Sequence, residues 1–218
     1  MKLTVLSAAA AAVIFVSCGP SAAEQAAARE KAVADSIAAA AGKEMNYTVD
    51  AGASTVRWAG NVTGAKVYGH YGNIGLNNGT FTTKGGQLVS GSFEVNMKGI
   101  TPLDSNYAPD GSKEGTTAAL IGHLATGEFF QADSFPTAMF KVTSVEGNIA
   151  TGELTVRGKT NTEKVTDIVI TEENGAAKAS GKLVFDRQKY GVSWKHFMKD
   201  AVLADNIELE ISLSGKAQ

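Results

Sequence analysis

The chain has 218 residues, 44% of them hydrophobic and 19% charged, which is the composition of a soluble globular protein with one large domain or two small ones. Its formal net charge of −2 argues against a nucleic-acid partner, because such a partner requires a basic face that displaces counterions from phosphates. The 24 glycines suggest frequent turns, which suit short strands better than long helices.

Residues 1–17 are typical of an export signal. Lys2 precedes the uncharged apolar run from Leu3 to Val16, which is shorter than the roughly 20 apolar residues that a membrane span needs. The run ends at Ser17-Cys18-Gly19, and a cysteine between small residues at this place resembles the cleavage site of bacterial lipoproteins. The alternative is an ordinary signal peptide that is cut further on, within Ser21-Ala22-Ala23.

Cys18 is the only cysteine of the chain, so it cannot form an internal disulfide. A diacylglycerol linked to its sulfur accounts for it, and we therefore predict lipidation at Cys18. The protein is then exported to the cell envelope, faces the periplasm and is held on a membrane by its N-terminal lipid. Gly19, rather than Asp, after the cysteine favours the outer membrane, by analogy with lipoprotein sorting in some bacteria.

Residues 18–44 are expected to form a lipidated N-terminus followed by an alanine-rich spacer. Alanine has the highest helix propensity, and no proline occurs between Ser21 and Lys43. The apolar stripe is thin, with Val33 and Ile37, so the segment can bury little by itself. The sequence predicts a helical or partly disordered spacer, roughly 30 Å long if it is fully helical. A partner-binding amphipathic helix is the alternative.

From residue 45 to residue 218 the apolar pattern changes to a period of two. The clearest example is Asn206–Leu213, where every second residue is apolar, as in a half-buried antiparallel strand. Turn signals separate such runs at Asn77-Asn78-Gly79, Lys84-Gly85-Gly86, Glu146-Gly147-Asn148 and Glu173-Asn174-Gly175. About eight to ten strands follow, and an antiparallel meander of this size tends to close into a barrel because closure removes its edges. We therefore predict an all-β fold, an antiparallel barrel of about eight strands with a short helix.

Residues 99–135 interrupt the strand pattern. A long polar loop comes first, then a helix-like piece from Thr116 to Ala125, and then Gly127-Glu128-Phe129-Phe130. A loop of this length inside a compact domain is usually functional or mobile. At the mouth of a barrel it could act as a lid that carries aromatic side chains inward.

Motifs that would carry catalysis or bind metal are not found. In the segment Gly152–Thr160 five residues separate the two glycines, where a phosphate-binding loop requires four, and a strand is expected to follow it. His70, His123 and His196 lie far apart without metal-ligand spacing, and there is no nucleophile elbow. The aspartates lie mainly in or beside turns, where they are favoured for local hydrogen bonds. We predict no enzymatic activity, no metal and no cofactor other than a bound lipid.

Three ordered motifs resemble the YceI-like polyisoprenoid-binding family. They are His123-Leu124-x4-Phe129-Phe130-x4-Phe135-Pro136-Thr137-Ala138-x-Phe140, Gly152-x-Leu154-Thr155-Val156-Arg157-Gly158-Lys159-Thr160 and Asp186-Arg187-x2-Tyr190-Gly191-Val192. The resemblance covers about residues 46–216 and excludes the spacer. It implies a lipocalin-like antiparallel barrel in an exported protein, which holds a long isoprenoid or a similar lipid.

The aromatic residues support a hollow interior, since an eight-stranded barrel has just enough room for side chains or for one ligand. We expect the ligand contacts to come from apolar positions of the strands and from the aromatic pair: Trp58, Phe93, Val95, Phe129, Phe130, Phe140, Val142, Leu154, Val156, Leu209 and Ile211. Arg187, Tyr190 and Gly191 are assigned to a structural turn, with the Arg187 guanidinium tying neighbouring strands or loops together.

The leading hypothesis is thus a lipoprotein whose barrel sequesters or carries a polyisoprenoid, a quinone tail or a fatty acyl chain. The alternative is a structural or interaction module of the envelope, in which the same apolar side chains fill the barrel. An enzyme acting on a lipid-linked substrate would need a polar cluster near the cavity, which the sequence does not reveal. The sequence is compatible with a homo-oligomer.

Overall fold

The computed structural model describes residues 21–64, 67–195 and 201–218, in two compact units that separate near residue 40. The predicted signal peptide and Cys18 lie outside these residues. The spacer is helical, as α1 (Ala22–Gly42). Ser21 and Glu24 begin it with reciprocal hydrogen bonds: the Ser21 N–H donates to Glu24 Oε2 at 2.7 Å, and the Glu24 N–H donates to Ser21 Oγ at 3.3 Å. In the described part of the chain, no helix has both the length and the apolar character needed to span a membrane.

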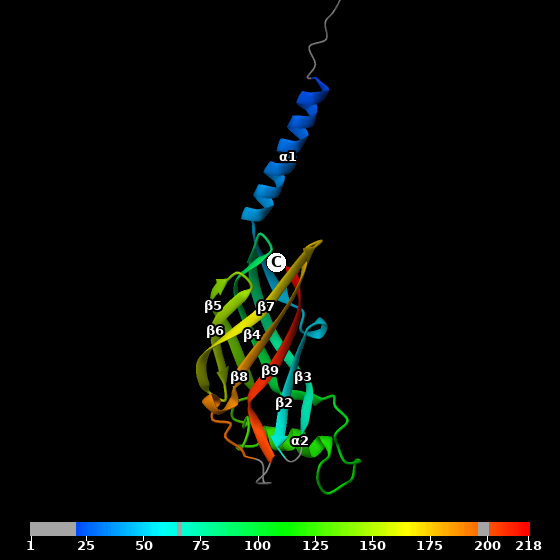
Figure 1. Cartoon of the computed structure of the whole chain (residues 1–218), viewed down its shortest axis with the longest axis vertical. Helices are drawn as coiled ribbons and strands as arrows, with labels where there is room; N and C mark the ends of the chain where they lie inside the picture. The colour runs from blue at the N-terminus through cyan, green and yellow to red at the C-terminus, as the bar shows by residue number, and fades with distance from the viewer. Residues whose placement is uncertain (1–20, 65–66, 196–200) are drawn as a thin grey trace, which may run out of the picture. The chain divides into compact units, whose positions relative to one another are not determined.

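The second unit is a closed antiparallel barrel (Figure 1). Its strands are β1 (Glu44–Val49), β2 (Thr55–Gly64), β3 (Tyr68–Lys84), β4 (Gln87–Pro102), β5 (Thr137–Glu146), β6 (Ile149–Val156), β7 (Lys159–Glu173), β8 (Ala176–Asp186) and β9 (Ala201–Ala217). They pair in the order β1-β3-β2-β9-β8-β7-β6-β5-β4, and the pairing of β3 with β4 closes the ring. The prediction of an antiparallel barrel is confirmed.

Two short strands share one position in the ring, between β3 and β9. β1 pairs with residues 80–84 of β3 and with the end of β9, whereas β2 pairs with residues 68–74 of β3 and with residues 201–212 of β9. A short 3-10 helix, Ala51–Ala53, connects them. The nine strands that the structure describes therefore fill eight positions, which agrees with the predicted number of about eight.

Three of the four predicted turns are hairpin turns. Lys84-Gly85-Gly86 connects β3 to β4, Glu146-Gly147-Asn148 connects β5 to β6, and Glu173-Asn174-Gly175 connects β7 to β8. The fourth, Asn77-Asn78-Gly79, is wrong, because it lies within β3 where the register to β4 is irregular. The glycine serves close packing here: a Cβ atom at Gly79 would lie 2.9 Å from Cδ1 of Phe93.

The hairpin between β6 and β7 supports the rejection of a phosphate-binding loop. Arg157 and Gly158 have positive φ angles of 50° and 70°, as in the type I′ turns that connect two strands. Strand β7 begins directly afterwards at Lys159, so no helix N-terminus is available there for a phosphate.

The predicted helix of the long insertion is also present. α2 (Thr117–Ala125) is capped by Thr116, whose side-chain oxygen accepts a hydrogen bond from the Ala119 N–H at 3.1 Å. Figure 1 shows α2 at the end of the barrel near the junction of β2 and β3. The insertion therefore covers one end of the barrel, as expected of a lid.

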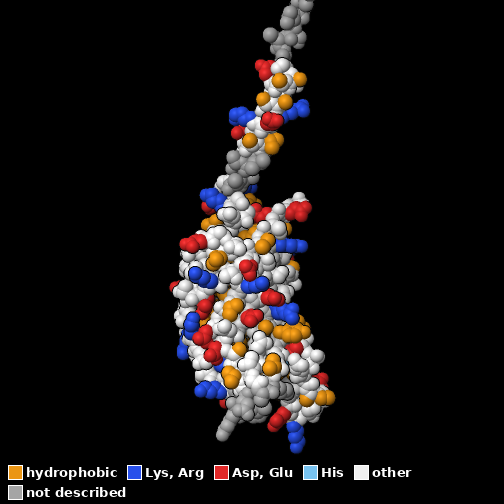
Figure 2. Space-filling view, viewed as in Figure 1, with side chains coloured by type: hydrophobic (Ala, Val, Ile, Leu, Met, Phe, Trp, Pro, Cys, Tyr) orange, Lys and Arg blue, Asp and Glu red, His pale blue; other side chains and the backbone are white. Residues whose placement is uncertain are grey.

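The outer wall of the barrel carries mixed charges on the face that Figure 2 shows. Figure 2 shows Lys and Arg side chains interspersed with Asp and Glu side chains on the visible face, with hydrophobic side chains scattered between them. The strands alternate, so their other side chains point inward and form two apolar clusters, one large and one small. The small one consists of Tyr47, Val49, Phe81, Ala177 and Leu213 and is called the plug below.

Candidate functional site

The barrel encloses an apolar cavity of about 860 Å³. This volume falls within the range of about 300–1,000 Å³ that is usual for small-molecule sites. Side chains from every strand of the ring except β1 line it, together with residues of α2 and of the loop before it. Arg187 is the one charged side chain among the described lining residues.

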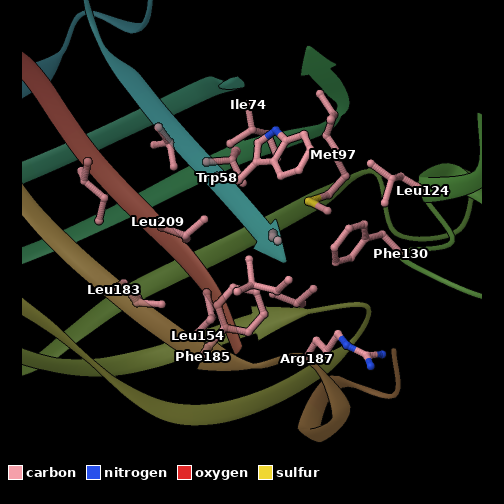
Figure 3. A pocket seen from close by; sticks show the side chains of 18 of the residues that line it. Trp58, Ile74, Met97, Leu124, Phe130, Leu154, Leu183, Phe185, Arg187 and Leu209 are labelled. Atoms are coloured by element: carbon pink, nitrogen blue, oxygen red, sulfur yellow. The ribbon is translucent and has the colours of Figure 1, made fainter. Parts of the chain in front are cut away.

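All eleven predicted ligand-contact residues line this cavity: Trp58, Phe93, Val95, Phe129, Phe130, Phe140, Val142, Leu154, Val156, Leu209 and Ile211. Figure 3 shows Trp58, Phe130, Leu154 and Leu209 directed into the same space from different elements. Their position follows from the alternation of the strands. Their contact with a ligand stays a prediction.

The plug closes one end of the cavity. The rings of Tyr47 and Phe81 stack with their centroids 5.0 Å apart, and both residues are 2% exposed. Phe81 and Leu213 belong to the plug and also line the cavity, so they form its floor. This end of the barrel is a packed core.

Aromatic residues cover the other end, beneath α2. The Phe129 ring lies 4.8 Å from the His123 ring, 5.4 Å from the Trp194 ring and 6.2 Å from the Phe130 ring. An extended chain would point Phe129 and Phe130 in opposite directions, but here the Phe129 N–H bonds to Thr126 O and the Phe130 N–H bonds to Leu124 O. The pair therefore lies in a tight turn, and both side chains line the cavity.

Arg187 is buried at the edge of the cavity, and its donors point to the protein. Nε donates to Ala204 O, Nη1 to Val192 O and Trp194 O, and Nη2 to Leu203 O and the Asp205 carboxylate, over 2.6–3.4 Å. A guanidinium has five N–H donors, and these bonds use all five. Burial lowers the pKa of Arg187, and Asp205 and Asp186 oppose that effect. The guanidinium thus connects its own turn to residues 203–205 of β9, and its structural role stays a prediction.

The adjoining turn is equally well fixed. Tyr190 is fully buried, and its hydroxyl donates to Glu163 Oε1 at 3.1 Å; burial and this carboxylate raise the pKa of the phenol. Gly191 follows with a φ of 77°, the left-handed conformation that glycine adopts without strain. Arg157 donates to Gly191 O at 2.5 Å and to Gly127 O at 2.6 Å, so it ties this turn to the segment before Phe129.

A polar cluster that the sequence did not reveal lies at the covered end of the cavity. The cluster consists of His70, Asp104 and Tyr107, and His70 and Tyr107 line the cavity. Asp104 Oδ1 lies 3.2 Å from His70 Nδ1, and Oδ2 accepts from the Tyr107 hydroxyl at 2.5 Å. The His70 and Tyr107 rings stack with their centroids 5.0 Å apart.

The charge of the polar cluster follows from its hydrogen bonds. Burial alone would raise the pKa of Asp104, but the hydrogen bonds from Tyr107, the Asn106 N–H, His70 and the Tyr71 N–H hold it below its usual value. Burial and the Asp104 carboxylate raise the pKa of the Tyr107 phenol. At neutral pH the cluster therefore holds an anionic Asp104 and an uncharged Tyr107. His70 and Asp104 are 34 positions apart, so sequence spacing offered no signal for their contact.

Trp58, another lining residue, has a buried donor without a partner. Its indole Nε1 is the one buried side-chain nitrogen or oxygen atom without a hydrogen-bond partner among the residues described. A buried tryptophan N–H usually has a partner, because leaving it unpaired costs free energy.

Within the described ranges, no three His, Cys, Asp or Glu side chains converge on a possible metal site, and His196 lies outside these ranges.

Comparison with known proteins identifies the fold. The family model described as the YceI-like domain matches residues 47–215. A UPF0312 protein of Staphylococcus aureus is 31% identical over 102 residues, an alignment that covers 41% of this chain and 57% of the relative. The chain thus spans little more than half the length of this curated relative.

Two solved structures share the barrel. BcnA of Burkholderia cenocepacia matches with a TM-score of 0.53 and 18% identity, over 76% of this chain and 98% of BcnA. A polyisoprenoid-binding domain of Saccharophagus degradans, implicated in plant cell wall breakdown, matches with a TM-score of 0.53 and 9% identity, over 80% of this chain and 99% of that domain. At these identities the similarity establishes the architecture alone.

Proposed function

The chain belongs to the YceI-like domain family, and on this premise we propose that its barrel binds one long apolar lipid, such as a polyisoprenoid, and shields it from water. The cavity of about 860 Å³ carries this proposal. Its lining is mostly apolar, and its floor is a packed core. A polyisoprenoid is the ligand class named for the domain of Saccharophagus degradans, which shares the architecture.

The hydrophobic effect supplies the driving force for such binding. Each methylene moved from water into the cavity gains about 0.8 kcal/mol, so several isoprene units give a large gross affinity. The ligand loses freedom when it is ordered, which offsets part of that gain. Among the lining residues that the structure describes, we find no nucleophile arranged with a general base and an oxyanion hole. We therefore propose a binding protein rather than an enzyme.

Lipid analysis tests this proposal directly. Residues 21–218 are purified without detergent, and the extract is examined by mass spectrometry. We expect about one long-chain lipid per protein molecule. Leu209→Trp, which replaces an aliphatic lining side chain with a large ring, serves as the blocked control and is expected to carry less lipid while remaining folded. An extract without lipid, together with failure to bind added polyprenol, would favour the alternative of a filled structural barrel.

We further propose that the protein is an envelope lipoprotein anchored through Cys18 and facing the periplasm. The apolar run Leu3–Val16 and the lone cysteine after it support this proposal. Cells grown with a labelled fatty acid should incorporate the label into the parent protein, and Cys18→Ala should abolish incorporation and lipoprotein-type processing. If the parent protein never incorporates the label, and Cys18→Ala fractionates with membranes as the parent does, the lipid anchor at Cys18 is ruled out.

A further inference from the structure

The segment between β4 and α2, residues 103–115, covers part of the cavity and is called the strap below (Figure 1). Its residues Ser105, Asn106 and Tyr107 line the cavity. The structure describes the whole strap, and none of its residues belongs to either apolar cluster. α2 differs, because its Leu124 is buried in the large cluster. A segment with few buried apolar contacts opens more readily than a packed one, so the strap is the weaker part of the cover.

Hydrogen bonds to the start of β3 hold the strap against the barrel wall. The Leu103 N–H donates to Tyr71 O at 2.8 Å. Asn106 Nδ2 donates to Gly69 O at 3.1 Å. Both bonds reach one short stretch of the wall, so the strap is attached there by polar contacts rather than by a packed core.

Asp104 is the centre of this attachment, and its side chain is only 3% exposed. On the wall side its carboxylate accepts hydrogen bonds from the Tyr71 N–H and from His70 Nδ1, each at 3.2 Å. On the strap side it accepts from the Asn106 N–H at 3.0 Å and from the Tyr107 hydroxyl at 2.5 Å. Hydrogen bonds to an ionised group are stronger than those between neutral groups. One carboxylate therefore ties the strap to the wall, and its loss would leave four donors without their acceptor.

The strap lies at the end of the cavity that a ligand has to cross, because the plug closes the other end. Asp104 is not among the described lining residues, so it holds the strap without touching the space that a ligand fills. We propose that the strap is the gate of the cavity and that Asp104 is its latch. The ligand passes when the strap detaches from residues 69–71 of β3, and the latch sets how often this occurs. The inference rests on the proposed function and adds the step that controls ligand exchange.

The rates of ligand exchange test the latch. Delipidated protein is mixed rapidly with geranylgeraniol, and binding is followed by the fluorescence of Trp58 and Trp194, which both line the cavity. Asp104→Ala should raise the association rate constant and the dissociation rate constant by the same factor, about tenfold. The dissociation constant should stay within about threefold, because the latch holds the empty and the loaded barrel alike.

Two further variants show whether the effect belongs to the hydrogen bonds of Asp104. Asp110→Ala removes an exposed carboxylate from the same strap, so it is the matched control and should leave both rate constants unchanged. Tyr107→Phe removes one donor to Asp104 and keeps the ring beside His70, so it should raise both rate constants by a smaller factor, about threefold. Equal rate constants in Asp104→Ala and Asp110→Ala, or a weaker affinity at an unchanged association rate, would overturn the latch.

Hydrogen exchange tests the gate without a ligand and, in the parent protein, without a variant. The amides of Leu103 and Tyr71, which join the strap to the wall, should exchange faster than that of Leu124 in α2. Asp104→Ala should accelerate exchange at Leu103, whose own hydrogen bond it does not remove, and leave Leu124 unchanged.

If Leu103 and Tyr71 exchange as slowly as Leu124 in the parent protein, the strap does not open separately and the gate is wrong. Failure of the parent protein to bind geranylgeraniol would instead overturn the proposed function, because hydrogen exchange reports the opening of the strap in the empty barrel.

Discussion

The two ends of the barrel are built from the same strand pattern and are packed in opposite ways. At the plug, Tyr47 and Phe81 stack on each other, and a Cβ atom at Gly215 would lie 2.8 Å from the Phe81 ring, so the aromatic rings occupy the space above this glycine. At the covered end, a Cβ atom at Gly60 would meet only Cδ1 of Ile207 within 4 Å, at 3.4 Å. One end is a solid core, and the other opens into a cavity of about 860 Å³.

The comparison shows that stability and ligand binding can be assigned to different parts of one apolar interior. Close packing stabilises a core through dispersion contacts and burial, so the loss of a side chain from such a core lowers stability strongly. A cavity lacks those contacts, so its lining residues contribute less to folding and remain available to a ligand. We therefore expect two classes of substitution. Those in the plug should mainly lower stability, and those in the cavity wall should mainly lower ligand affinity.

The largest loss of stability is expected at the plug. Phe81→Ala removes a ring that is 2% exposed and stacked on Tyr47, and it should lower the free energy of unfolding by about 3–5 kcal/mol. Urea unfolding of the lipid-free protein measures it. Phe81→Leu, which retains much of the volume, is the control and should cost clearly less. If Phe81→Ala lowers the free energy of unfolding no more than a substitution in the cavity wall does, the division between a packed plug and a cavity is wrong.

Arg187→Ala is expected to have the second-largest effect. The variant leaves carbonyl groups of four residues without their donor, which should cost on the order of 2–3 kcal/mol. The folded fraction should keep its lipid affinity, because the guanidinium donors are all used within the protein. Lys189→Ala removes an exposed cation from the same turn and should leave the melting temperature unchanged. Lost binding at an unchanged melting temperature would instead place Arg187 at the ligand.

The adjacent residues Phe129 and Phe130 at the covered end should fall into different classes, the first affecting stability and the second affecting ligand affinity. Phe129 is 8% exposed and contacts the His123 and Trp194 rings, so Phe129→Ala should destabilise the empty protein more than Phe130→Ala. For Phe130→Ala we expect a loss of about 1 kcal/mol in the empty protein and an affinity for polyprenol that falls about tenfold. Unfolding with and without lipid measures both effects. Equal losses in both variants, with unchanged affinity, would mean that the pair is ordinary core.

The sequence allowed the architecture to be predicted because each strand carries its own period-two pattern and each hairpin its own turn residues. The helix-like piece from Thr116 to Ala125 was also predicted, and α2 begins one residue later because Thr116 is its N-cap. The lining residues followed from the same alternation. The exception among the turns, Asn77-Asn78-Gly79, has turn chemistry but is used for close packing within β3.

What the sequence could not show depends on contacts between distant segments. Tyr47 and Leu154 follow the same alternation, yet only the fold reveals that one belongs to the plug and the other to the cavity wall. The ring of Phe140 lies over Gly152, where a Cβ atom would come within 2.5 Å of Cζ, and this contact between β5 and β6 also appears only in the fold. The polar cluster of His70, Asp104 and Tyr107 likewise arises only when the loop after β4 reaches the start of β3.

The smallest expected effect concerns the helix that covers the cavity. Thr116→Ala removes the cap that accepts from the Ala119 N–H and should weaken the first turn of α2 by about 1 kcal/mol. Because α2 lies over one end and not within the plug, global unfolding should change little, while hydrogen exchange at Ala119 and Leu120 should become faster. If α2 is the lid that a ligand passes, the dissociation rate of bound polyprenol should rise a few-fold with it. Thr116→Ser keeps the hydroxyl and should restore both rates. Faster exchange in α2 with an unchanged dissociation rate would mean that the ligand leaves by another route.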